Sequence, residues 1–476
     1  MIRVIARKEL VETLRDGRFR WMAGVLLALL LVALITGLAA VRDTRRAIES
    51  ARTAEARTWL GQGERNPHSA AHFGRFAFKP TPMLAYVDRG LDSYLGITVW
   101  LEAHRQNPFG LRPAEDRTAL QRFGDLTAAF VLQLLVPLFV ILLCFGAFAS
   151  ERDSGTLRQL LAAGAKPLSL ALGKSLGLTA ALSFVLLPAA ICAGVLSTIG
   201  FPQNGAGDQA ARGLLLAGVY LAYALTFVAA SLAVSAWARS ARTAITVLLC
   251  LWVTTTLIVP RLAADVAERS HPTPTPAEFH SRIAEAEANG LGEDGTAGER
   301  RDGLRREVLD RYGVETVEEL PVDFAGISLQ ASEEYSNKVF DHFFGELWST
   351  YRAQESVLRF ASLASPLLAV RALSMELAGT GLESHRHFAD AAEEHRRVFV
   401  KYLNDDMTHN AVGQSFSYVA DQDVWAGAPP FEYEPPSVAA LVEENSVALL
   451  VLLSWLAAAA LVSWSSCRRL GTEVAS

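Results

Sequence analysis

Six long apolar runs, separated by polar segments, dominate the pattern of side chains along the chain. Each run holds roughly 20 residues and lacks Asp, Glu, Lys and Arg, as expected of a helix that crosses the hydrocarbon core of a bilayer. The runs cover residues 21–41, 126–149, 175–200, 213–238, 243–260 and 446–466. We therefore predict a polytopic α-helical membrane protein with six transmembrane helices.

Basic residues gather in the polar segments on one side of these spans. Residues 1–20, 150–174, 239–242 and 467–476 together contain 14 Lys and Arg but six Asp and Glu, although the whole chain has a net charge of −6. Because basic segments remain on the cytoplasmic side, both termini and the 150–174 segment are predicted to be cytoplasmic. The acidic total gives no indication of a nucleic-acid partner.

The two long polar segments then fall on the external side. Residues 42–125 and 261–445 are predicted to form one α-rich (α+β) external domain from two insertions. The first part of the earlier insertion, up to residue 60, should continue the first span outward as a helix. Phe360–Val370 is apolar but too short to span, which favours a buried core helix or one against the outer membrane surface.

The first twenty residues are basic and have apolar positions at helical spacing. This pattern predicts a cytoplasmic helix that lies in the membrane interface before the first span. The alternative is an arm that binds a partner.

The segment 150–174 lies between the second and third spans and is short and charged. Asp153 or Ser154 can cap a helix there, and Gly164 is a natural stop. Leucines at positions 157, 160 and 161 then share one face. A short amphipathic helix held between two spans can transmit a movement of a soluble partner to the membrane-spanning helices. The alternative is an ordinary loop that happens to be helical.

The motifs for chemistry on this chain are weak, and we predict no catalytic residue. Gly173-Lys174-Ser175 imitates the end of a phosphate-binding loop, but Leu168 stands where the first Gly is required. The spans lack ionisable residues, which disfavours an ion-driven carrier. Four polar residues in the spans are candidates for lining a pathway, the alternative being contacts between helices. They are Gln133, Thr246, Thr254 and Thr255.

The histidines all lie in the predicted external segments. The group His385, His387 and His395 suggests a metal site, but helical positions i and i+2 point apart. Solvated or hydrogen-bonded histidines are the better interpretation, so no metal site is predicted.

The sequence ERDSGTLRQLL, directly after the second span, resembles the glutamate–x–x–x–glycine–threonine–leucine signature of type 2 ABC transporter permeases. The motifs at 70–78 and 387–404 are similar to the subfamily with large external domains, which includes permeases for gliding motility and nitrous oxide reductase maturation. In this family the loop is a coupling helix that docks on a separate ATPase. The resemblance implies ATPase contacts at Glu151, Gly155, Thr156 and Leu157. Around them, Arg152 and Arg158 would add polar contacts at the rim, and Leu160 and Leu161 would extend the apolar face of the contact.

The resemblance implies a permease subunit of an ATP-driven exporter in a bacterial inner membrane, with a periplasmic domain. A second permease, identical or homologous, and ABC ATPase subunits would be its partners. ATP and Mg²⁺ would bind to the ATPase, and we expect no cofactor on this chain. One alternative is a mechanotransmitter that acts on an external protein without transport. Another is a sensor that has no ATPase.

Overall fold

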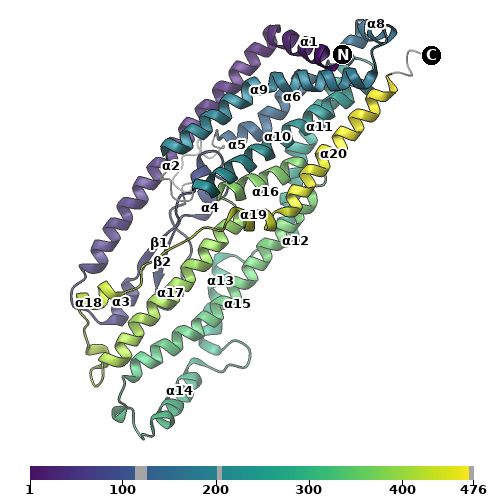
Figure 1. The fold of residues 1–476 in the computed structure, drawn as a ribbon. Helices are drawn as coiled ribbons and strands as arrows, with labels where there is room; N and C mark the ends of the chain where they lie inside the picture. Colours follow the sequence, from purple (N-terminus) through teal and green to yellow (C-terminus); the bar gives the residue numbers. More distant parts are fainter. Residues whose placement is uncertain (113–125, 201–205, 471–476) are drawn as a thin grey trace.

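The structure is a computed structural model that describes residues 1–112, 126–200 and 206–470. The end of the predicted insertion 42–125 and most of the predicted tail 467–476 lie outside the described residues. The molecule is elongated, and most of its described length is helical (Figure 1).

Six helical segments are long and apolar enough to cross a membrane, as predicted, and this confirms the fold class. The second comprises α5 (Ala128–Phe130), the π-helical turn η3 (Val131–Leu135), α6 (Val136–Cys144) and α7 (Ala149–Asp153). The fifth comprises α11 (Ala241–Val253), the π-helical turn η4 (Thr254–Ile258) and α12 (Val259–Ser270). The others are α2 (Gly17–Leu60), α9 (Pro167–Gly200), α10 (Ala206–Trp237) and α20 (Ser446–Arg469).

Several of these helices are longer than their apolar runs. At a rise of about 1.5 Å per residue, α2 is roughly 66 Å long, about twice the thickness of a hydrocarbon core. It therefore continues into the soluble part, as predicted for residues up to 60. The fifth span likewise continues beyond its predicted end at residue 260 and reaches Ser270 through α12.

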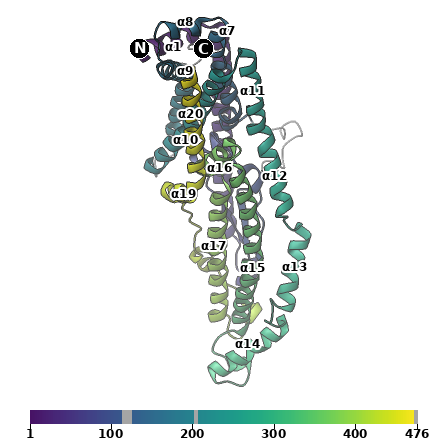
Figure 2. The same cartoon turned by 90° about the vertical axis from the view of Figure 1, so that its right-hand side faces the viewer.

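Both ends of the described chain lie at one end of the molecule, together with α1 (Ile2–Arg15) and α8 (Thr156–Ala162) (Figure 1, Figure 2). Helix α1 packs along α9, where glycines allow close approach. A Cβ at Gly173 would lie 2.6 Å from Ile5 Cβ, and a Cβ at Gly177 would lie 2.6 Å from Glu9 Cβ. The first helix is thus attached to the third span; its position in the membrane interface stays a prediction.

The soluble domain lies at the other end of the molecule (Figure 1). Its main helices come from the second insertion and are α13 (Pro276–Asn289), α14 (Ala297–Tyr312), α15 (Phe324–Ala361) and α17 (Leu382–Asn410). Shorter elements of the same insertion are η5 (Val317–Glu319), η6 (Ser415–Ser417), α18 (Gln422–Gly427) and α19 (Val438–Glu444). The first insertion adds α3 (Pro67–Phe73), β1 (Arg75–Phe78), η1 (Met83–Tyr86), α4 (Asp92–Leu95), β2 (Thr98–Glu102) and β3 (Arg105–Gln106).

The three strands form an antiparallel sheet in the order β1-β2-β3, with Arg75 opposite Leu101 and Glu102 opposite Arg105. One face buries Val99 and Leu101 against Phe388 of α17. The two insertions therefore share a core, as the prediction of one domain requires.

A second contact joins the insertions through tryptophans. Trp59 of α2 donates its Nε1–H to the carbonyl of Trp425 at 2.9 Å, and Trp425 donates to the carbonyl of Gly63 at 2.8 Å. The Trp59 ring also packs on Phe399, with centroids 5.2 Å apart. These buried aromatic contacts fix the far end of α2 on the domain.

Helix α16 (Pro366–Ala378) is buried between the spans and the domain. It packs against α10 and α20 and contacts both π-helical turns. The prediction of one short helix over Phe360–Val370 was wrong in its bounds, because Phe360 is exposed near the end of α15 and the buried helix begins only at Pro366. Pro366 begins the helix, where a missing N–H costs nothing, and Arg371 lies inside it.

Candidate coupling site and its connection to the soluble domain

The segment after the second span bends at Gly155 and then forms α8. Gly155 has φ of 77° and stands at the N-cap of α8, where no side chain caps the helix. The prediction that Asp153 or Ser154 caps this helix is therefore wrong. The chain needs a left-handed residue between α7 and α8, and Gly adopts that conformation at little cost. Gly164, with φ of 84°, follows the end of α8, as predicted for a stop.

The leucines of α8 share one face, as predicted, and this face points into the protein. Leu157 is 3% exposed, while Leu160 and Leu161 are half-buried against the same core. The exposed side of α8 carries Arg158 and Gln159. Because the apolar face is occupied by the membrane bundle, the surface that a partner can reach is polar.

Glu151 lies in a buried ion cluster. Its Oε1 accepts from Nζ of Lys174 at 2.8 Å, and the same Nζ donates to Oε1 of Glu9 at 2.6 Å. Lys174 is 2% exposed. Lys8, whose side chain is 48% exposed, lies 3.8 Å from Glu151 and 3.9 Å from Glu9. The cluster joins α1, α7 and α9, so Lys174 has a structural role that its position in a false phosphate-loop motif did not indicate.

The two residues after Glu151 hold the turn between the fourth and fifth spans. Arg152 donates to the carbonyls of Ala236 and Ala238, which have no partner within α10. Asp153 accepts from the N–H of Ala241 at 3.0 Å, at the beginning of α11. Arg152 therefore points toward the bundle, and not toward the rim of the predicted ATPase contact.

The predicted coupling residues thus divide into two sets. Glu151, Arg152 and Leu157 connect the segment to the bundle, whereas Gly155 and Arg158 are exposed. Thr156 is half-buried, and its hydroxyl lies 2.9 Å from that of Ser154.

The four predicted pathway residues are not brought together. Gln133 is buried and donates to the Tyr220 hydroxyl at 3.2 Å. Thr255 is buried and donates to the carbonyl of Leu251 in its own helix at 2.8 Å. Thr246 and Thr254 are exposed.

The π-helical turns of the second and fifth spans leave carbonyl groups free for side chains. The Gln133 carbonyl in η3 accepts from the Tyr223 hydroxyl at 3.0 Å. The Leu134 carbonyl accepts from Trp252 at 3.2 Å, and the Thr255 carbonyl in η4 accepts from the Ser365 hydroxyl. Wide turns of this kind are frequent at functional sites, and here both contact α16.

A chain of hydrogen bonds connects α16 to both insertions and to the fourth span. Ser374 of α16 donates to Oδ2 of Asp88, and its hydroxyl lies 2.7 Å from that of Tyr220 in α10. Glu376 accepts from the N–H groups of Glu383 and Ser384 at 3.1 and 3.2 Å. Glu376 therefore caps the beginning of α17, which has no side-chain cap of its own.

The histidines considered from the sequence meet separate aromatic partners. His385 is buried beside Phe109, with ring centroids 4.5 Å apart, and burial lowers its pKa to about 3. His387 lies 3.1 Å from the Tyr433 hydroxyl, and His395 packs on the ring of Phe431.

Two family models match this chain. Residues 104–261, which include α7 and α8, match the ABC-2 family transporter protein. Residues 278–434, most of the second insertion, match a domain of unknown function, DUF3526. The search of curated proteins gave no match. Together with the six membrane-length helices, these matches support an ABC-2 type permease role for a multi-pass membrane protein that carries an additional domain.

Proposed function

We propose that this chain is the membrane subunit of an ATP-driven exporter, and that a separate ABC ATPase docks on the exposed face of α8. The observation that carries the proposal is the double attachment of α7. Its Glu151 is bonded to Lys174 of α9, while Arg152 and Asp153 hold the α10–α11 turn. A force applied to α8 would therefore reach the third, fourth and fifth spans directly.

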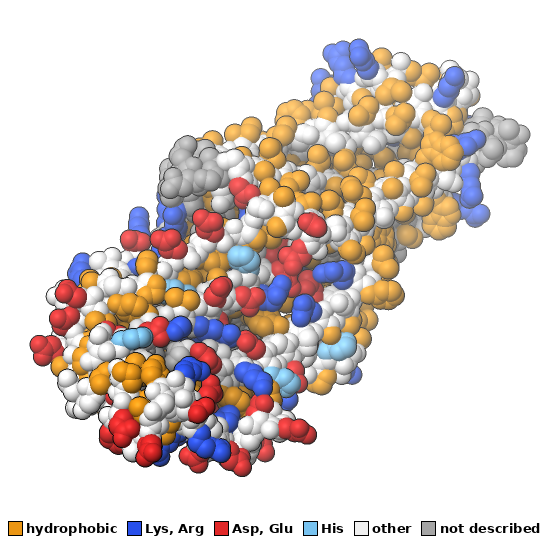
Figure 3. Space-filling view, turned by 60° about the horizontal axis from the view of Figure 1, so that its bottom comes forward, with side chains coloured by type: hydrophobic (Ala, Val, Ile, Leu, Met, Phe, Trp, Pro, Cys, Tyr) orange, Lys and Arg blue, Asp and Glu red, His pale blue; other side chains and the backbone are white. Residues whose placement is uncertain are grey.

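Charge supports a cytoplasmic position for the α8 end. On the face shown in Figure 3, hydrophobic side chains cover the bundle, Lys and Arg gather at its end, and charges of both signs cover the soluble domain. Basic residues at one end of a membrane bundle favour the cytoplasmic side. The soluble domain would then be periplasmic, in the inner membrane of a bacterium, with both termini cytoplasmic.

The route from the spans to the domain runs through continuous elements. Helices α2 and α12 extend beyond their apolar runs, and α16 lies against both π-helical turns. Switching of ABC permeases between two arrangements would shift these helices as rigid bodies, because packed helices slide or rotate as units. A second permease subunit, identical or homologous, would complete the assembly.

A mechanotransmitter without transport is a second candidate. The buried positions of Gln133 and Thr255 favour the mechanotransmitter, because both side chains form their hydrogen bonds inside the bundle and do not face a pathway. Substrate-stimulated ATP turnover and uptake into inverted vesicles would favour export. Nucleotide-dependent movement of the domain without any transported solute would favour transmission to an external protein.

The coupling proposal is tested by co-purification with the ABC ATPases of the same organism, each expressed together with this chain. Arg158→Glu combined with Ala162→Glu changes two exposed positions of α8 and leaves its buried leucines intact. We expect the double variant to fold, to lose the ATPase and to lose ATP turnover in lipid. Lys166→Glu, an exposed charge reversal just outside α8, is the matched control and should retain both. Equal capture by the double variant and the control would contradict docking on α8.

A further inference from the structure

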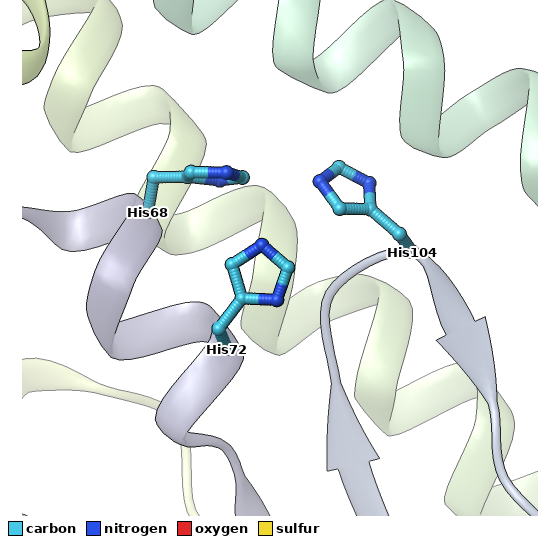
Figure 4. A group of neighbouring side chains, drawn as sticks. All are labelled: His68, His72 and His104. Atoms are coloured by element: carbon cyan, nitrogen blue, oxygen red, sulfur yellow. The ribbon is translucent and has the colours of Figure 1, made fainter.

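Three histidines of the first insertion converge in the soluble domain, far from the coupling segment. His68 and His72 lie one turn apart on α3, so their side chains share one face. His104 lies in the turn between β2 and β3, and its ring centroid is 5.2 Å from each of the other two. Figure 4 shows the three rings facing a common point. Their ligand nitrogens lie within 4.8 Å of one another.

His104 is held in place by a buried carboxylate. The backbone nitrogen and the ring Nδ1 of His104 each lie 2.7 Å from Oε1 of Glu333, which belongs to α15. A proton on Nδ1 then leaves Nε2 with a free lone pair toward the other rings. A carboxylate behind a histidine is the usual outer partner of a metal ligand, because it fixes the tautomer and the ring orientation.

Glu333 is itself fixed by Arg396 of α17. Glu333 is 2% exposed, and its Oε2 accepts from Arg396, which is 1% exposed, at 3.1 Å. The guanidinium also donates to both oxygens of Glu393. This network holds His104 at φ of 61°, a conformation that is uncommon for residues other than Gly.

The other two histidines have ligand character. Nδ1 of His68 is buried and has no hydrogen-bond partner among the described residues. Burial, with repulsion from the neighbouring imidazoles, lowers the pKa of His68 to about 4 and also lowers the pKa of His72. A lowered pKa favours the neutral imidazole, which is the form that binds metal.

We propose that His68, His72 and His104 bind a divalent transition-metal ion of the zinc–copper class. Imidazole nitrogens suit these ions, and three protein ligands leave a fourth position open. A cavity of about 740 Å³ borders His104 and Phe416 and can admit water or a small ligand. In a tetrahedral zinc site the nitrogens lie about 3.4 Å apart, so the rings must turn inward on binding. His72 is exposed and free to do so.

The test uses the full-length protein in detergent, stripped with EDTA and titrated with Zn²⁺ alone. We expect one zinc per chain by elemental analysis, and a Co²⁺-loaded sample with the visible absorption of a tetrahedral site. His72→Ala and His68→Ala should lower affinity by more than tenfold, and Glu333→Gln by about 10- to 100-fold. The matched control His280→Ala, an exposed histidine of α13, should bind as the wild type does. Equal binding by His72→Ala and His280→Ala would overturn the proposal, as would a wild type that binds no zinc. Neither outcome depends on ATPase docking.

Discussion

Replacement of Lys174 by Met removes the cation at the centre of the cluster that joins α1, α7 and α9. Lys174 is 2% exposed and bonded to Glu9 and Glu151 at 2.6 and 2.8 Å. Loss of this cation leaves the two largely buried carboxylates with only the half-exposed Lys8, at 3.8 and 3.9 Å, as a partner within the cluster, and breaking a buried ion pair costs about 3–5 kcal/mol. Met keeps the length of the aliphatic stem, so the lost free energy of unfolding comes mainly from charge. Equilibrium unfolding in mixed micelles, followed by tryptophan fluorescence, measures it.

The chain provides a matched control in Lys8, which faces the same two carboxylates from a half-exposed position. Lys8→Met should cost less than about 1 kcal/mol, because solvent screens exposed ion pairs. Adding Glu9→Gln and Glu151→Gln to Lys174→Met should recover most of the loss, since no uncompensated charge then remains. A cost for Lys174→Met as small as that of Lys8→Met would refute the reasoning. So would a triple variant less stable than Lys174→Met alone.

Three further outcomes follow from the structure. Gly155→Val should weaken ATPase capture and cost about 1–2 kcal/mol, because φ of 77° strains a β-branched residue, whereas Gly155→Asn should be tolerated; pull-down and unfolding check both. Tyr220→Phe should cost about 1–2 kcal/mol by leaving the Gln133 amide unpaired, and an unchanged unfolding midpoint would count against the buried chain of bonds. Burial lowers the pKa of His385 to about 3 in the folded protein, whereas a histidine in the unfolded chain titrates near pH 6.5. As the pH falls below about 6.5, the unfolded chain therefore takes up a proton that the folded protein does not, and the free energy of unfolding decreases. Between pH 7 and pH 5, the free energy of unfolding of His385→Gln should therefore decrease by about 2 kcal/mol less than that of the wild type, as measured by unfolding titrations at each pH.

Features that depend on local pattern were predictable. Apolar runs of membrane length predicted all six spans, and their basic flanks led to a proposed orientation. Helical spacing placed Leu157, Leu160 and Leu161 on one face of α8. It did not show that this face packs inward, because the same pattern arises whether an apolar face meets the bundle or a partner.

The sequence by itself thus determined the class of membrane protein, the six spans and the position of the short polar segment that contains α8, since each follows from the pattern of neighbouring residues. Only the tertiary structure decided which side chains meet across long separations. Lys174 donates a hydrogen bond to Glu9, at a sequence separation of 165 residues, and His104 donates one to Glu333, at a separation of 229 residues. The i, i+4 spacing of His68 and His72 was a visible signal, but its third member comes from a β-turn. Such sites arise from helix packing and strand pairing, which place distant residues at bonding distance without leaving a local pattern.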